Sequence, residues 1–366
     1  MQQVALMAAT TTMTDAPIIV DADIIDVAVV APAKKKRSRP ATLASGNRIG
    51  AWRVESQLGR GGMAAVYAVT HARFGKRAAL KLAHRAILGP AFTPETFLRE
   101  ARIVHLVNHP GVPDVFATGT FDGRPYLAME RLTGETLGEV HDRGELTRPR
   151  AVEVLRAICD VLGAAHDAGV VHRDLKLDNV FIEQTGRVRL LDWGVARIVG
   201  EADPLRGMIA GTLTYVAPDQ VRGEEITPAA DVYSLGVLAY QLLLGAPPFT
   251  AASDLEMCKK HMDEPAPAPS ARWAEIPQAL EQLLVAMLDK DPENRPSLQE
   301  VARVLGALRL ERTTNPRLQW LSLQLVPPID VLGRPAIRLG PRQRVASAML
   351  GLVVAAASVA SLFVTS

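Results

Sequence analysis

The stretch "VVHRDLKLDNV", from Val170 to Val180, places one histidine, one arginine, one lysine, two aspartates and one asparagine between apolar residues. Charged side chains are seldom found in an apolar setting unless they are paired or take part in chemistry. The stretch is therefore either a solvated loop or a group of charges arranged for a reaction. Patterns elsewhere in the chain decide between the two.

Length and composition set the first limits. The chain has 366 residues, of which 48% are hydrophobic, so it can bury a large core and is long enough for two lobes or domains. Its 41 basic and 39 acidic residues nearly cancel, and we expect no nucleic-acid partner. The two cysteines, Cys159 and Cys258, lie in stretches with helical patterns, which argues against a disulfide framework and favours a reducing compartment.

Residues 1–46 are predicted to form a disordered tail. Acidic residues interrupt its apolar part and no Lys or Arg precedes that part, so it does not fit a signal peptide. The tail carries the basic run "KKKRSRP", Lys34 to Pro40. This run is either a solvated linker or a segment that binds a nuclear importer, nucleic acid or an anionic membrane.

The chain from Val345 to Ser366 contains no charged residue and is long enough, as a helix, to cross a hydrocarbon core about 30 Å thick. We predict a transmembrane helix at 345–366, preceded by a basic juxtamembrane linker at 311–344. Arginines at positions 338, 342 and 344 place the upstream chain in the cytoplasm by the positive-inside rule. The alternative is an Ala-rich amphipathic or buried helix.

Small residues recur at every fourth position of this segment, at Ser347, Gly351 and Ala355. Such spacing lets two membrane helices approach closely. It raises a homodimer as a possible assembly, although the spacing arises easily by chance in an Ala-rich stretch.

Between these ends, the chain has two regions with different secondary-structure patterns. Strand patterns and one long helical pattern occupy 51–132, whereas helical patterns dominate 133–310. The predicted strands are "WRVESQLG" (52–59), "AAVYAVTH" (64–71), "RAALKLA" (77–83) and "RPYLAME" (124–130), and the predicted helices include "PETFLREARIVHLV" (94–107), "RAVEVLRAICDVLGAAHDAG" (150–169) and "PAADVYSLGVLAYQLLLG" (228–245). The pattern predicts a small, mostly-β lobe followed by a larger, mostly-α lobe.

Three features of the first lobe belong together. "GRGGMAAV", Gly59 to Val66, lies between two predicted strands, where glycines let backbone amides approach phosphate oxygens. Lys81 lies within an apolar strand and needs an anionic partner. Glu100, in the predicted helix, is a candidate for that partner. Each feature alone is weak evidence of function.

Taken in order, the motifs of the chain resemble those of eukaryotic-type Ser/Thr protein kinases, in the style of bacterial (Hanks-type) members. The motifs are "GRGGMAAV", "AALK", "FLREA", "HRDLKLDN", "LLDWG", "GTLTYVAPD", "DVYSLGV" and "DPENRP". The resemblance implies an α+β, bilobal protein-kinase fold over 47–310, with an N-lobe at 51–132 and a C-lobe at 133–310. It also implies that ATP and Mg²⁺, or Mn²⁺ in its place, bind between the lobes.

By this resemblance, Asp174 orients the attacking Ser or Thr hydroxyl of a protein substrate and accepts its proton. Lys176 neutralises the transferred phosphoryl group, and Lys81 binds the α and β phosphates while Glu100 holds that lysine. Asn179 and Asp192 are the implied metal ligands. His172 is expected to bond to backbone groups as a scaffold residue.

The resemblance also implies a nucleotide-binding set made of the glycine-rich loop, residues that sandwich the adenine, and the connection between the lobes. Met129 is the implied gatekeeper, and the Glu130 carbonyl and the Leu132 amide are expected to bond to the base. The full set is Leu58, Gly59, Arg60, Gly61, Gly62, Met63, Ala64, Ala65, Val66, Ala79, Lys81, Met129, Glu130 and Leu132.

Several positions depart from the family pattern. Ala64 replaces the third glycine of the loop, Trp193 replaces the usual Phe, and Leu177 stands where Pro is common. Asp219 replaces a Glu that pairs with an arginine, here Arg295, and the shorter carboxylate is expected to pair less well. None of these changes removes a catalytic group.

The segment from Val195 to Ala210 contains no Ser, Thr or Tyr. Family members usually order this segment by pairing an arginine, here Arg173, with a phosphorylated residue. We predict that Glu201 or Asp203 pairs with Arg173 instead; the alternative is that both acids are solvated. Thr212, the first hydroxyl that follows, is expected to contact the catalytic aspartate and lysine.

The resemblance therefore predicts an enzyme that transfers the γ-phosphoryl group of MgATP to protein Ser and Thr hydroxyls, in signalling at the cytoplasmic face of a membrane. A catalytically weak or dead scaffold of the same fold is the first alternative, and a small-molecule phosphotransferase is the second. Lys81, Asp174 and Asp192 are all present, which argues against the first alternative.

Overall fold

A computed structural model describes residues 43–89, 92–203, 205 and 212–308, together with the backbone of 28–29 and 208–209. The predicted linker at 311–344 and the predicted membrane helix at 345–366 lie outside these ranges, as does most of the predicted tail at 1–46. Within the described ranges, none of the helices combines the length and the apolar character needed to cross a membrane.

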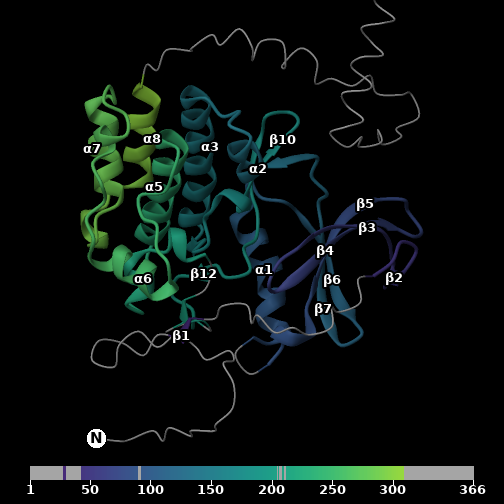
Figure 1. Cartoon of the computed structure of the whole chain (residues 1–366). Coiled ribbons are helices and arrows are strands. Elements are labelled where there is room, and N and C mark those ends of the chain that lie inside the picture. The colour runs from purple at the N-terminus through teal and green to yellow at the C-terminus, as the bar shows by residue number, and fades with distance from the viewer. Residues whose placement is uncertain are drawn as a thin grey trace, which may run out of the picture. The chain divides into compact units, whose positions relative to one another are not determined.

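The N-lobe is built on a six-stranded antiparallel sheet with the strand order β2-β3-β4-β5-β7-β6 (Figure 1). Its apolar residues alternate along the strands and form a core around Trp52, Leu80 and Leu82. The four predicted strands are present, and two further strands, β2 and β6, were not predicted. The strands are β2 (Arg48–Ile49), β3 (Trp52–Arg60), β4 (Ala64–His71), β5 (Arg77–Ala83), β6 (Val115–Phe121) and β7 (Arg124–Met129).

Helix α1 (Pro94–Val107) lies against β6 and β7 of this sheet (Figure 1). The Thr93 hydroxyl caps its first turn by accepting a hydrogen bond from the Thr96 amide, and Pro94 occupies its first position. Asn108, in the left-handed conformation, ends it. Its buried residues recur at helical spacing, which turns Phe97, Glu100 and Ile103 inward.

The C-lobe is mostly helical, as predicted (Figure 1). Its helices are α2 (Leu137–Asp142), α3 (Arg148–Asp167), α4 (Pro218–Val221), α5 (Ala229–Leu244), α6 (Asp254–Asp263), α7 (Gln278–Met287) and α8 (Leu298–Ala307). Short strands join them: β8 (Gly134–Thr136), β10 (Val180–Glu183) and β11 (Val188–Leu190) form one antiparallel sheet, and β9 (Val170–Val171) pairs with β12 (Arg197–Ile198). β1 (Ala28–Val29) pairs in parallel with β13 (Met208–Ile209).

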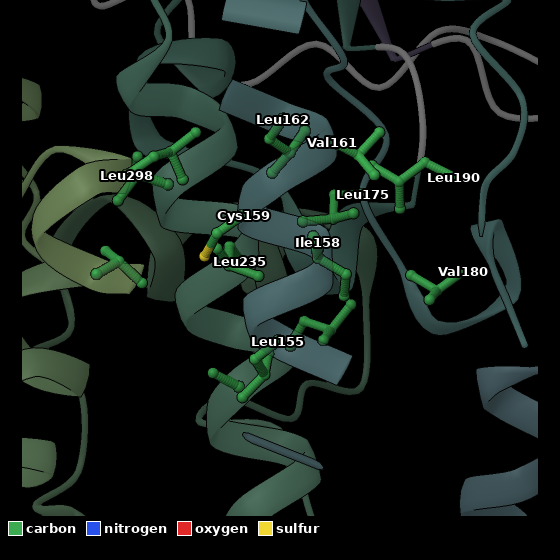
Figure 2. Close-up of a cluster of buried hydrophobic side chains, with 14 of the residues drawn as sticks. Leu155, Ile158, Cys159, Val161, Leu162, Leu175, Val180, Leu190, Leu235 and Leu298 are labelled. Atoms are coloured by element: carbon green, nitrogen blue, oxygen red, sulfur yellow. The ribbon is translucent and has the colours of Figure 1, made fainter. Parts of the chain in front are cut away.

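Apolar residues of the stretch 170–180 are part of the core of the C-lobe. Figure 2 shows side chains of α3, among them Leu155, Ile158 and Leu162, packed with Leu175 and with residues of α5 and α8. Leu175 is fully buried, and burying a leucine stabilises a fold by about 1.5–3 kcal/mol. Because Leu175 lies between Asp174 and Lys176, its burial fixes the backbone that carries both.

Both cysteines are buried and free. Burial raises the pKa of the Cys159 thiol to about 12 and that of the Cys258 thiol to about 11. Their packing is apolar, since Cys159 belongs to the main C-lobe core and Cys258 packs with Val216 and Val221. Neither cysteine takes part in a disulfide, in agreement with the sequence.

Candidate active site

The glycine-rich loop is the turn between β3 and β4. The Gly61 amide donates to the Ala64 carbonyl at 2.9 Å, which closes the turn. His84, the residue after β5, makes two contacts with the loop. Its amide donates to the Met63 carbonyl at 2.8 Å, and its Nε2 lies 3.1 Å from the Gly61 carbonyl. A Cβ at Gly59 would meet no atom within 4 Å. The space beside the loop backbone therefore remains open for a ligand.

Lys81 lies between two carboxylates. Its Nζ is 2.6 Å from Glu100 Oε2 and 2.6 Å from Asp192 Oδ1. Burial alone would lower the pKa of Lys81, but the charges of Asp192 and Glu100 outweigh it and raise that pKa above its usual value. Burial likewise acts to raise the pKa of Asp192, and the Lys81 ammonium outweighs it and lowers this pKa to about 2. The strand β5, the helix α1 and the loop after β11 thus meet at one cation.

Gly194 leaves room for this cluster. A Cβ at this position would lie 3.2 Å from Asp192 Oδ1, 3.3 Å from Glu100 Oε2 and 3.5 Å from Lys81 Nζ. Asp192 itself has a φ of 59°, a left-handed conformation that costs a non-glycine residue about 1–3 kcal/mol. Such a cost is tolerated where the surrounding structure fixes the backbone for function.

Trp193, which replaces the usual Phe, is buried in the C-lobe. Its indole Nε1 donates to the Leu190 carbonyl at 3.1 Å, and its ring packs on the His172 ring with centroids 4.5 Å apart. A phenylalanine has no N–H group for this hydrogen bond. The hydrogen bond and the ring contact together hold Trp193, the neighbour of Asp192, in the C-lobe core.

Asp174 is the centre of the stretch 170–180. Lys176 Nζ lies 2.6 Å from its Oδ2, and Asn179 Nδ2 donates to the same oxygen at 3.0 Å and to the Asp174 carbonyl at 2.7 Å. The Thr212 amide donates to Asp174 Oδ1 at 3.1 Å. Thr212 therefore contacts the aspartate through its backbone amide, and its predicted contact with Lys176 stays a prediction.

A buried carboxylate, Asp231 of α5, fixes the backbone just before Asp174. Its oxygens accept hydrogen bonds from the amides of His172 (2.8 Å) and Arg173 (2.9 Å) and lie 2.8 Å from His166 Nε2. Arg173 has a φ of 70°, which is again left-handed. His172 bonds to backbone groups through both ring nitrogens, with the Asp174 amide at 3.3 Å and the Leu191 carbonyl at 3.2 Å, as expected for a scaffold residue.

The predicted adenine contacts lie along one rim. Ala79 and Met129 are register partners in β5 and β7, and Val66 faces Lys81 across β4 and β5. Leu58, at the end of β3, is among the exposed large hydrophobic residues. Of the other predicted members, Gly59 and Arg60 end β3, residues 61–63 form the turn, Ala64 and Ala65 begin β4, and Glu130 and Leu132 follow β7.

Sequence reasoning missed a chain of ion pairs at this connection. Arg189 of β11 pairs with Glu130 and, at 2.8 Å, with Glu183. Arg131, which follows Glu130 in the sequence, pairs with Glu55 of β3 at 2.7 Å. Consecutive residues of the connection thus bind opposite lobes. No local pattern announces these pairs, because the partners are far apart in the sequence.

The segment after β12 carries the two acids singled out from the sequence. Asp203 accepts two hydrogen bonds from Arg173, at 3.0 Å from Nη1 and 2.5 Å from Nη2. Glu201 instead pairs with Arg102 at 2.7 Å and with Arg99 at 3.5 Å, both on α1. Arg173 is therefore paired with an acid of this segment, and Asp203 is that acid.

Comparison with known proteins agrees with this geometry. The family model of the protein kinase domain matches residues 52–304. The chain belongs to the protein kinase family.

Individual kinases match the same part of this chain. It is 39% identical over 256 residues to "Serine/threonine-protein kinase Pkn1" of Myxococcus xanthus, covering 68% of this chain and 37% of that protein. It is 34% identical over 275 residues to "Serine/threonine-protein kinase pkn3" of the same organism, covering 71% and 50%. It is 35% identical over 246 residues to "Serine/threonine-protein kinase PknB" of Mycobacterium tuberculosis, covering 65% and 39%. These matches span half or less of the relatives' own length.

The kinase domain has a donor set that fits a magnesium ion. Asn179 and Asp192 offer amide and carboxylate oxygens, which this hard cation prefers. The Asn179 amide nitrogen is occupied by Asp174, which leaves its side-chain oxygen as a free acceptor among the described residues. The Leu191 amide donates to the Asn179 carbonyl at 2.7 Å and so holds the two ligand-bearing segments side by side.

Asp219 and Arg295 form a buried pair in the C-lobe of this kinase domain. Arg295 Nη2 lies 2.7 Å from Asp219 Oδ1, and both side chains are buried. Neither carboxylate oxygen has a hydrogen-bond partner among the described residues, since the arginine donates to the carbonyls of Asp289, Ala229 and Lys290. The aspartate thus approaches the arginine without the geometry of a hydrogen bond, as expected from its shorter side chain.

Proposed function

We propose that the chain is a protein-serine/threonine kinase that transfers the γ-phosphoryl group of MgATP to protein hydroxyls. The observation that carries this proposal is the group around Asp174, where one buried carboxylate meets Lys176, Asn179 and the Thr212 amide. Family membership and the names of the relatives support it.

In this proposal the carboxylate of Asp174 orients the substrate hydroxyl and accepts its proton. Lys176, 2.6 Å away, offsets the charge that develops on the phosphoryl group. Lys81 binds the α and β phosphates, and its contact with Glu100 sets its direction. A Mg²⁺ or Mn²⁺ ion, where bound, would offset the negative charge of the phosphates. Asn179 and Asp192 would hold that ion.

The adenine site is proposed on the rim formed by β3, β4, β5 and the connection after β7. Leu58, Val66 and Ala79 would enclose the base, and the backbone of Glu130 and Leu132 would bond to it. The glycine-rich loop would cover the phosphates with its backbone amides.

The place of action is proposed to be the cytoplasmic face of a membrane. Support comes from the uncharged stretch 345–366 and the arginines before it. Deleting 345–366 should move the protein from the membrane fraction to the soluble fraction. Retention of the truncated, non-aggregated protein in the membrane pellet would contradict the anchor and leave the basic run 34–40 as the better candidate.

The activity is tested with the purified full chain, MgATP and a basic protein substrate. Replacing Asp174 with Asn should lower kcat by about 10²- to 10⁴-fold, the usual contribution of a general base. Asp160→Asn is the matched control, because Asp160 is an exposed aspartate of α3 whose ion-pair partner among the described residues is His109. Phosphoamino-acid analysis should find phosphoserine or phosphothreonine.

Two outcomes would contradict the proposal. Equal rates for the wild type and Asp174→Asn would show that the carboxylate has no catalytic role. An inactive wild type that still binds ATP would favour the scaffold alternative.

A further inference from the structure

Glu201 and Asp203 stand two residues apart and bind different parts of the kinase domain. Asp203 binds Arg173 through two hydrogen bonds, and both side chains are less than a tenth exposed. Glu201 binds Arg99 and Arg102 of α1. One short segment therefore connects the stretch 170–180, the proposed catalytic loop, with helix α1 of the N-lobe.

The arginines at both ends of this connection lie within two positions of active-site residues in the sequence. Arg173 precedes Asp174, and its left-handed backbone is held by the Asp231 carboxylate. Arg99 and Arg102 flank Glu100, whose carboxylate holds Lys81. A movement of the acidic segment would thus reach Asp174 through one arginine and Glu100 through the other two.

Both acids supply their charge without any modification. Burial acts to raise the pKa of Asp203, but its hydrogen bonds with Arg173 and the nearby positive charge lower this pKa below its usual value. The Leu205 amide adds a further hydrogen bond to Oδ1 at 3.0 Å. Arg173 is therefore already neutralised by a carboxylate in a bidentate arrangement, the geometry that gives such pairs their strength.

We propose that Glu201 and Asp203 are positioning residues that hold α1 and the catalytic loop in their working arrangement by fixed charge, without a phosphate on this segment. The inference rests on the proposed kinase function and adds its mode of control. The absence of Ser, Thr and Tyr from Val195 to Ala210 agrees with it. The kinase would be assembled as soon as it folds, and control of its activity would have to act elsewhere.

The test compares Glu201→Gln, Asp203→Asn and Asp203→Glu in the full chain. Glu300→Gln is the matched control, because Glu300 is an exposed acid of α8 that pairs with Arg303 far from the site. Wild-type protein is assayed before and after phosphatase treatment, and mass spectrometry verifies that phosphate has been removed.

We expect phosphatase-treated wild type to keep its kcat. Asp203→Asn should lower kcat by about 10- to 100-fold, in the range that a small misplacement of a catalytic group causes. Its KM for ATP should change little, and Asp203→Glu should recover part of the rate. Glu201→Gln should raise the KM for ATP as well, because Glu100 and Lys81 follow α1.

Hydrogen exchange provides a readout that does not depend on activity. Amides of 94–107 should exchange faster in Glu201→Gln, whereas those of 170–180 should exchange faster in Asp203→Asn. The melting temperatures of both variants should stay close to that of the control.

Two results would overturn the inference. A large loss of activity on dephosphorylation would show that a phosphate is needed. Exchange patterns in both variants that equal those of Glu300→Gln would show that the acids position nothing. If the wild type transfers no phosphate at all, the proposed function fails, and the exchange data still decide whether the acids hold the two elements.

Discussion

Arg173 with Asp203 and Arg295 with Asp219 are both buried arginine–aspartate pairs, yet their geometry differs. In the first pair, two nitrogens donate to two carboxylate oxygens. In the second pair, the atoms approach to 2.7 Å, but neither aspartate oxygen accepts a hydrogen bond from the described residues. A short distance alone therefore does not define a strong pair.

The difference follows from what each pair connects. Asp203 lies between β12 and β13, outside any helix or strand. Asp219 lies at the start of α4, and Arg295 is fixed by three backbone carbonyls and by the Tyr233 ring, 5.0 Å from its guanidinium carbon. Asp219 and Arg295 are thus each held by their own surroundings, and the pair has the short distance without the geometry of a hydrogen bond. We expect the first pair to affect activity more and the second to affect stability more.

The largest expected effect on stability is at the pair of Arg295 and Asp219. Arg295→Met should lower the free energy of unfolding by about 3–5 kcal/mol, because it leaves the Asp219 charge buried and unpaired. Arg173→Met should cost less stability and more activity, since the segment with Asp203 can return its carboxylate to water. Urea unfolding and initial rates measure the two quantities.

A double variant controls for this experiment. Arg295→Met combined with Asp219→Leu should recover most of the lost stability, because an apolar pair of similar volume often replaces a buried ion pair without cost. Equal stability losses in Arg295→Met and Arg173→Met would break the comparison.

A smaller effect is expected from lengthening the aspartate. Asp219→Glu should raise the free energy of unfolding by about 1 kcal/mol, because the added methylene lets the carboxylate form the hydrogen bond that it lacks. Asp203→Glu should not stabilise, since its pair is already bonded. Thermal unfolding of both variants tests this. A loss of stability in Asp219→Glu would mean that the site has no room for the longer side chain.

The smallest effect is the pH dependence of the first pair. Because the pKa of Asp203 is lower in the folded state than its ordinary value of 3.8, its carboxylate stabilises the fold above that pH. This contribution is lost as the pH falls from 3.8 through the folded pKa. The stability difference between wild type and Asp203→Asn, measured by urea unfolding, should therefore be present at pH 7 and shrink below 3.8. A difference that persists at the lowest pH would have to come from packing.

Local patterns predicted four strands of the N-lobe sheet and the three longest helices of the kinase domain. The strands at 64–71 and 77–83 and the helix at 94–107 have the predicted bounds, because alternation and helical spacing are written in consecutive residues. The strand β6, "VFATGTF", was missed, since Gly119 and its threonines weaken the pattern and pairing with β7 decides its structure. The regions 1–27, 30–42 and 309–366 lie outside the described residues, so their predictions remain predictions.

The candidate site divides in the same way. The motifs predicted that Glu100 holds Lys81, and these two side chains are in contact in the folded chain. The links of Glu201 to α1 and of Glu130 to Arg189 were not predicted, because each joins residues that are more than fifty positions apart and carry ordinary surface charges. Only the folded chain brings such charges together.

Because both cysteines are buried, we expect the thiols of the native protein to react little with labelling reagents. With thiol pKa values of about 12 and 11, Cys159 and Cys258 expose almost no thiolate near pH 7, so alkylating probes should leave the folded protein unmarked. A single cysteine at an exposed site would then carry a fluorophore alone. Ala202, exposed between the two acids, is such a site, and a dye on Ala202→Cys would report directly whether their segment moves when ATP binds.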